Sequence, residues 1–451
     1  MRMNRMGERN RLRDIWNRLL TVPGNMTAYW TGKVAGWLQS AKLSGDAVEL
    51  SVTKEEIRSL RKLAASFAEK DYPGTPPRLT AEEISLVQSI RDETKRCNRN
   101  NVTRTMAYWR VFERSPVLQW AFLAHMVSRN GGWSMTDLKG ELYSRLLAPD
   151  RSDTIFDFLE SANSLIFQDA YPQLRLYESS MERRRNLFHL LPVFGVSAFM
   201  RPVWEQFWRE GNSALLTVGL IVNEQHYIEG RVVQDERFRR AILDTADFQA
   251  QTVLQLNCLL FPYAPEGALA HPEASSQPRN HRLAGLILED FSDLSGRIEF
   301  GKALYAILFA VPAVAKGVRD FASSRTHTGS RADYWPGIFA TLRSEPPKAQ
   351  YVEKLDGGIL LPGATPLYSP KLEQAWKDKP FTPPDRYDWY RLRAGSTVSG
   401  RATDRERGGN DDPFRYFGKM RPPLHYEMTN EYSFALNKLE LAVLAGDMLF
   451  D

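Results

Sequence analysis

Side chains that can exchange protons and hold anions gather in "AHMVSRNGGWSMTDLKGELYSRLL", residues 124–147. His125 offers an imidazole that titrates near neutral pH, and Arg129 offers a planar guanidinium that binds carboxylates or phosphates. Asn130 and Asp137 follow in the same stretch. This combination could form an active site or an anion-binding site, or it could hold a structural corner together.

The structural interpretation accounts for most of these side chains. Gly131-Gly132 predicts a sharp turn between two helices, because glycine tolerates positive φ. Asp137 then stands where a capping box places its acid in the second helix, and Arg129 offsets the dipole at the end of the first. His125 has no such local role. In the functional alternative, the free amides at the start of the second helix hold an anionic group together with Arg129.

A second stretch, "SSRTHTGSRADYWPGIF" (residues 323–339), repeats this design. Gly329 predicts a turn, and His327, Arg331, Asp333 and Trp335 surround it. Two turns with the same residue types predict that their arginines face a common cleft.

The third candidate lies in "ALLTVGLIVNEQHYIEGRVV" (residues 214–233), where an apolar run leads into Glu224 and His226. A polar group deep in an apolar helix must be paired, or it costs a few kcal/mol. An ion pair between Glu224 and Arg231 is one solution, and a catalytic role is the other. Glu-x-His lacks the i, i+4 spacing of a zinc-binding helix, so we predict no metal site. No nucleotide-binding or hydrolase motif occurs, and we expect no cofactor.

Two of these segments, "LAHMVSRNGGWSMTDLKG" and "HTGSRADYWPGIF", resemble the hallmark segments of a bacterial family from spore-forming Gram-positive bacteria. That family is classified as a domain of unknown function. The resemblance extends over residues 90–345 and includes "YSPKLEQAW" at 368–376. It implies a bacterial, cytoplasmic protein, and it implies no reaction, cofactor or catalytic residue.

Helix-start signals recur along the chain, and they must position these side chains. A hydroxyl stands three residues before an acid at Thr53, Thr80, Ser134 and Ser330, which is the pattern of a capping box. Strand-like alternation is scarce, and the best case is "DAVELSV" at 46–52. The pattern predicts an all-α protein with a multi-helix globular core.

Composition changes predict three regions. Residues 1–80 form a basic, amphipathic helical region and linker, with the linker at "DYPGTPPRLT" (71–80). Residues 81–345 form the helical core, interrupted by a Pro- and Ser-rich stretch at 262–281. Residues 346–451 form an irregular, Pro/Gly-rich arm that ends in a packed helix.

The bulk composition narrows the class of protein. With 43% hydrophobic and 25% charged residues, the chain has a globular balance. A net charge of +5 is too small to favour nucleic-acid binding, and two cysteines far apart favour reduced thiols in the cytoplasm. In residues 1–20, arginines flank an apolar helical stripe. That arrangement suits an anionic membrane surface, which would place the protein peripherally at the inner membrane, or an acidic protein partner.

The sequence therefore favours a binding or scaffold protein that recognises an anionic group or a protein partner. The alternative is an enzyme of unfamiliar type, with a histidine as acid–base and an arginine to stabilise negative charge. Nucleic-acid binding is a weaker alternative. The candidate residues for a cleft are His125, Arg129, Asn130, Glu224, His226, His327, Arg331, Asp333 and Trp335.

Overall fold

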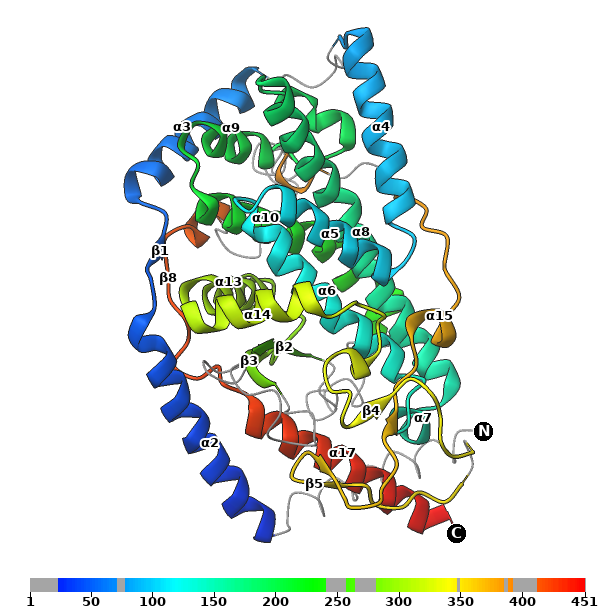
Figure 1. Cartoon of the computed structure of the whole chain (residues 1–451). Coiled ribbons are helices and arrows are strands. Elements are labelled where there is room, and N and C mark those ends of the chain that lie inside the picture. Colours follow the sequence, from blue (N-terminus) through cyan, green and yellow to red (C-terminus); the bar gives the residue numbers. More distant parts are fainter. Residues whose placement is uncertain are drawn as a thin grey trace.

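The central helices form a bundle around a largely apolar interior (Figure 1). A computed structural model of the chain describes residues 23–70, 78–240, 257–263, 281–346, 349–384, 388–391 and 412–450. The bundle consists of α5 (Asn101–Arg114), α6 (Gln119–Asp137), α8 (Pro149–Arg183), α10 (Ser213–Ile228) and α13 (Leu294–Ala310). Every residue of α10 from Ala214 to Asn223 is buried, as expected for a helix that is apolar on all sides.

Other helices surround this bundle. In Figure 1, α3 and α9 lie above it, while α2 and α17 pair below it. The bounds of the surrounding helices are α2 (Pro23–Leu43), η1 (Ser44–Asp46), α3 (Lys54–Lys70), α4 (Ala81–Cys97), α7 (Tyr143–Leu146), η2 (Phe188–Phe194), α9 (Met200–Glu210), η3 (Glu229–Val233), α11 (Glu236–Phe238), α14 (Pro312–Ser324), η5 (Arg331–Asp333), α15 (Leu372–Ala375), η6 (Pro413–Tyr416) and α17 (Thr429–Phe450). The all-α class predicted from the sequence is confirmed.

The strands form short two-stranded pairs in the described part of the chain. The longest pair joins β2 (Cys258–Tyr263) and β3 (Arg282–Ile287), antiparallel, with Leu260 opposite Gly285. The others are β1 (Leu50–Ser51) with β8 (Lys419–Met420), β4 (Phe339–Ala340) with β7 (Leu367–Tyr368), and β5 (Leu355–Asp356) with β6 (Ile359–Leu360). The alternation predicted at 46–52 thus yields a strand of only two residues.

Two of the predicted capping boxes are confirmed. Thr80 caps α4, where its hydroxyl accepts from the Glu83 amide and the Glu83 carboxylate accepts from the Thr80 amide. Thr53 and Glu56 exchange the same two hydrogen bonds at the start of α3. Ser330 caps η5 through the Ala332 amide, without the reciprocal bond.

The predicted turn at Gly131-Gly132 is wrong. α6 is one continuous helix from Gln119 to Asp137, so Ser134 is no cap. A β-carbon on Gly132 would lie 2.5 Å from Asn101 Oδ1 and 2.8 Å from His327 Cε1. Glycine is present here because neighbouring side chains approach the helix closely, and not because the chain reverses. The turn predicted at Gly329 is confirmed by its φ of +85°.

One hydrophobic cluster runs through the three regions that composition predicts. It contains Val52 and Leu60 from the first, α5, α6 and α10 from the second, and Leu367 and Leu436 from the third. The closing helix predicted for the last region is α17, and it packs against α2. The predicted basic helix at 1–20, residues 71–77 of the linker and residues 392–411 of the Pro/Gly-rich arm lie outside the described residues.

Within the described residues, no single helix has the length and apolar character of a membrane span. α13 and α14 together meet the length and composition criteria, but they meet at an angle of 91°.

Candidate functional site

The two polar stretches that the sequence pairs do meet in space. Trp133 of α6 and Tyr334 beside η5 contact each other edge to face, with ring centroids 6.5 Å apart. His327 Nε2 lies 2.9 Å from Asn101 Oδ1, against Gly132. The question is then whether the meeting point is open enough to bind anything.

Each arginine at this junction is buried among protein groups. Arg129 donates to the carbonyl of Arg325 at 2.8 Å, and its guanidinium lies 4.8 Å from the Phe321 ring. Arg331 forms an ion pair with Asp137 and lies 4.3 Å from the Trp133 ring centroid. Both guanidiniums therefore serve the packing of α6 against the following segments.

The two histidines at the junction are also packed inside. His125 is 1% exposed, and its Nδ1 lies 2.9 Å from the Thr105 carbonyl. Burial, and then the charge of Arg129, hold the pKa of His125 well below its usual value. Burial likewise lowers the pKa of His327, although the Asp333 carboxylate, 3.6 Å from its Nδ1, opposes the shift. Both imidazoles are therefore neutral at physiological pH.

The remaining predicted residues of the junction also make internal contacts. The Asn130 side chain bridges to β2, donating to the Leu260 carbonyl and accepting from its amide. Asp333 accepts from the amide and hydroxyl of Thr328, and Trp335 stacks on Tyr432 at 4.4 Å. The hollow beside Arg331 measures about 10 Å³, which is room for about one water molecule. The junction has the geometry of a packed structural corner.

The third sequence candidate divides into two environments. His226 stacks on Trp389 at 4.1 Å, and its Nδ1 contacts the Val222 carbonyl at 2.8 Å. Arg231 lies over the Tyr227 ring. Glu224, in contrast, faces a large cavity on the other side of α10. The structure thus separates Glu224 from His226 and from the junction.

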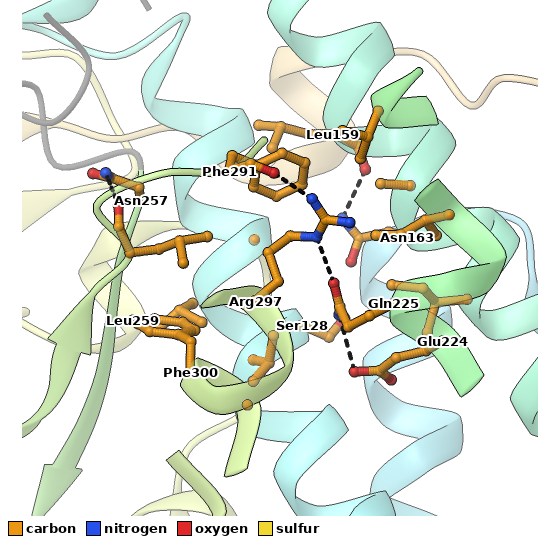
Figure 2. Close-up of a pocket in the computed structure, with 18 of the residues that line it drawn as sticks. Ser128, Leu159, Asn163, Glu224, Gln225, Asn257, Leu259, Phe291, Arg297 and Phe300 are labelled. Atoms are coloured by element: carbon orange, nitrogen blue, oxygen red, sulfur yellow. Dashed lines mark hydrogen bonds between the residues drawn. The ribbon is translucent and has the colours of Figure 1, made fainter. Parts of the chain in front are cut away.

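This central cavity lies between α5, α6, α8, α10, α13 and η3, with residues of β2 and of the segment after β3 at its edge. It is partly open to solvent, and it measures about 1170 Å³. Its walls are mainly apolar and include Leu123, Val127, Phe158, Leu159, Ile166, Ile228, Phe300 and Leu304. Figure 2 shows Phe291, Leu259 and Phe300 around the space, with Glu224 and Gln225 on the α10 side. The volume is slightly above the usual range for small-molecule pockets, and apolar walls interrupted by polar side chains are typical of a ligand site.

Glu224 is the acid that stands out in this cavity. Burial raises its pKa to about 8, although hydrogen bonds from Gln225 and Trp120 partly oppose the shift. The charge of Asp169 raises it further. At neutral pH the Glu224 carboxyl is therefore mostly protonated, and it can donate a hydrogen bond into an apolar space.

A hydrogen-bonded chain links Glu224 to the opposite wall. Gln225 Nε2 donates to Glu224 at 3.3 Å, and Gln225 Oε1 accepts from Arg297 Nε at 2.9 Å (Figure 2). Arg297 also forms an ion pair with Glu229 and donates to the Phe291 carbonyl. These bonds fix the Gln225 amide, so the orientation of its donor toward Glu224 is set by the protein.

The helix after Glu224 changes its winding at the cavity wall. η3 is a π-helical turn from Glu229 to Val233, and both of these residues line the cavity. Such turns occur mostly as single insertions in helices and are frequent at functional sites. Here the turn places Glu229 opposite Arg297.

Sequence reasoning identified Glu224 and missed the rest of the cavity. The signal for Glu224 was an acid at the end of an apolar run. Arg297, Phe158 and Phe300 carry no such signal, because each lies in a long helix whose apolar residues look like ordinary core positions in sequence. Their meeting depends on contacts between helices that are far apart in the chain.

Fold and cavity define a helical protein with a large interior site. A family model described as "Protein of unknown function (DUF2515)" matches residues 96–401, and the chain belongs to this family. The chain is also 39% identical over 261 residues to "Uncharacterized protein YppC" of Bacillus subtilis (strain 168), covering 58% of this chain and 77% of that protein. No solved structure matches the chain. The predicted resemblance to a bacterial family of unknown function is confirmed.

Proposed function

We propose that this protein is a binding protein that holds a mainly apolar small molecule in the central cavity, with a polar group of that molecule against Glu224. The observation that carries the proposal is a mainly apolar space of about 1170 Å³ with the half-buried Glu224 carboxyl, oriented by Gln225, in its wall. Apolar walls supply affinity through the hydrophobic effect, and a few fixed polar groups select the orientation of the ligand.

Most of the candidate residues predicted from the sequence lie outside the site that we propose. His125, Arg129, His327 and Arg331 do not line the central cavity. Their contacts explain them as packing groups of the junction between α6 and η5. For these residues to bind an anionic group, or for a histidine to act in catalysis, the contacts of the junction would have to break. A ligand can enter the central cavity without breaking them.

The proposal is tested with N-phenyl-1-naphthylamine, an apolar probe whose fluorescence rises when it leaves water. Ala162 of α8 lines the cavity, so Ala162→Trp fills part of the space. Ala65 of α3 is exposed and does not line the cavity, so Ala65→Trp makes the same change elsewhere. Both variants are first checked for cooperative unfolding.

The wild-type protein and Ala65→Trp should bind the probe saturably, with similar affinity. Ala162→Trp should weaken binding at least tenfold, because the indole occupies the space of the ligand. Equal binding by Ala162→Trp, or no saturable binding by the wild type, would overturn the proposal.

A further inference from the structure

The charged groups of the cavity wall that are not exposed are already matched, with one exception. Arg297 is paired with Glu229, and Arg104 is paired with Glu160. Arg239, Glu289 and Asp290 also line the cavity, but they are exposed at its rim. An anionic ligand group would therefore have to break an internal ion pair, or remain at the rim, in the part of the cavity that the structure describes.

Glu224 is the exception. Its hydrogen-bond partners, Gln225 and Trp120, are neutral donors, and the ionic group that acts on it most is the acid Asp169. The charged or titratable groups on the neighbouring helices are Arg104 and Tyr108 of α5, Asp169 of α8 and Arg297 of α13. Arg104 and Arg297 are held by their own acids, so neither neutralises Glu224.

We propose that the ligand of the central cavity is an amphiphile with a basic amine, and that its ammonium group pairs with the Glu224 carboxylate while its apolar chain lies along α6, α8 and α13. This inference rests on the proposed function, because it names the chemistry of the molecule that the cavity holds. An ammonium provides both the positive charge and the hydrogen-bond donors that the Glu224 carboxylate lacks. The apolar chain contacts the wall formed by Leu123, Phe158 and Phe300.

Binding of the amine exchanges one proton with solvent. The ligand enters as an ammonium ion, the neutral Glu224 carboxyl releases its proton to bulk water, and the ion pair forms. The net charge at Glu224 is zero before binding, because the carboxyl is protonated. It is also zero after binding, because the ammonium and the carboxylate cancel. Affinity for the amine should therefore rise with pH through the titration of Glu224, whose pKa in the unliganded protein is about 8.

The test uses three probes with the same ten-carbon chain, namely decylamine, decanol and decanoate. Each is titrated below its aggregation concentration against the N-phenyl-1-naphthylamine complex at pH 6 and pH 8. At pH 8, decylamine should bind at least tenfold more tightly than the other two, and its advantage over decanol should shrink at pH 6.

The matched variants are Glu224→Gln and Glu299→Gln. Both change Glu to Gln on helices of the cavity, but Glu299 points outward, with a side chain that is 57% exposed and paired with Lys302. Glu224→Gln should abolish the preference for the amine and its dependence on pH, and Glu299→Gln should retain both.

The outcomes separate the two proposals. If N-phenyl-1-naphthylamine does not bind saturably, the binding function itself is wrong. If it binds but decylamine does not displace it, the cavity binds apolar molecules and the amine is wrong. If the three probes bind equally, or decanoate binds best, the cavity binds apolar molecules but the amine is wrong. A preference that survives in Glu224→Gln would place the ammonium elsewhere and would also overturn the inference.

Discussion

Gly132 shows that one residue type can serve two different structural roles. A glycine pair predicts a turn, yet Gly132 lies inside α6 and faces Asn101 and His327. Asn101 already donates to the Ser128 carbonyl at 2.9 Å and accepts from His327 at 2.9 Å, so its side chain has little freedom to move. Position 132 requires glycine because of Asn101 and His327, which lie far away in the chain. The sequence around position 132 does not show these contacts.

Gly132→Ala should therefore destabilise the protein by about 1–3 kcal/mol, because the added methyl group overpacks this contact. Gly131→Ala is the matched control. A β-carbon there would lie 3.6 Å from Asn163 Nδ2, an ordinary contact, and alanine favours a helix by about 1 kcal/mol over glycine. Chemical unfolding of both variants checks this. Equal stability of the two would contradict the explanation.

His125 provides a second test at the same scale. Its ring contacts Trp109 at 5.2 Å between centroids, in addition to the Thr105 carbonyl. We expect His125→Gln to lower the free energy of unfolding by about 1–3 kcal/mol, as for other buried polar groups that lose a partner. A variant within about 0.5 kcal/mol of the wild type would return His125 to the list of functional candidates.

Among the elements, α6 is the one that joins the structural corner to the central cavity. Its buried face near Trp133 packs against η5, while Leu123, Val127 and Ser128 line the cavity. The sequence predicted the helical periodicity on both sides of residues 131–132, and it predicted that the arginines of this stretch and of residues 323–339 face a common cleft. The structure brings the two stretches together as a packed corner. It could not show that the helix continues, because a chain reversal and a close helix contact both require glycine.

The ion pair between Arg331 and Asp137 should account for much of the stability of this corner. Arg331→Met leaves Asp137 buried at 5% exposure without its cation, and we expect a loss of about 3–5 kcal/mol. Arg58→Met is the control, because Arg58 is 69% exposed and its pair with Glu55 contributes at most about 0.5 kcal/mol. Similar melting temperatures for the two variants would show that the corner does not depend on the buried pair.

At the scale of the whole molecule, buried titratable groups predict how stability varies with pH. Burial raises the pKa of Glu224 to about 8 and that of Asp169 to about 7. The folded state therefore binds more protons than the unfolded state above the ordinary carboxyl pKa, and stability falls as pH rises through this range. His125 and His327, with lowered pKa values, act oppositely, and their effect fades as pH rises above the ordinary histidine pKa of about 6.5.

Stability should therefore decline between pH 6.5 and pH 8, where the two acids lose their protons and the opposing effect of the histidines fades. Glu224→Gln cannot ionise, so it should gain about 1–2 kcal/mol relative to the wild type over that interval. Urea unfolding at several pH values measures the difference. A constant difference across the interval would mean that Glu224 is already ionised at pH 6.5.

The sequence was sufficient for the helical class, the family resemblance and the caps at Thr53 and Thr80, and it named Glu224 as one of several candidate site residues. It was insufficient for the cavity, because the wall is assembled from α6, α8, α10 and α13, whose apolar faces look alike in sequence. Which apolar face packs tightly and which leaves a space depends on how the helices cross, and the hydrophobic pattern of each helix alone does not specify this.

The central claim is that the space beside Glu224 holds an apolar molecule. A crystal structure of the protein with N-phenyl-1-naphthylamine tests it most directly. The account predicts that the probe lies between α6, α8 and α13, in contact with Leu123, Phe158 and Phe300 and beside the Glu224 carboxyl. A structure in which the protein's own side chains fill this space, or in which the probe binds only elsewhere, would contradict it.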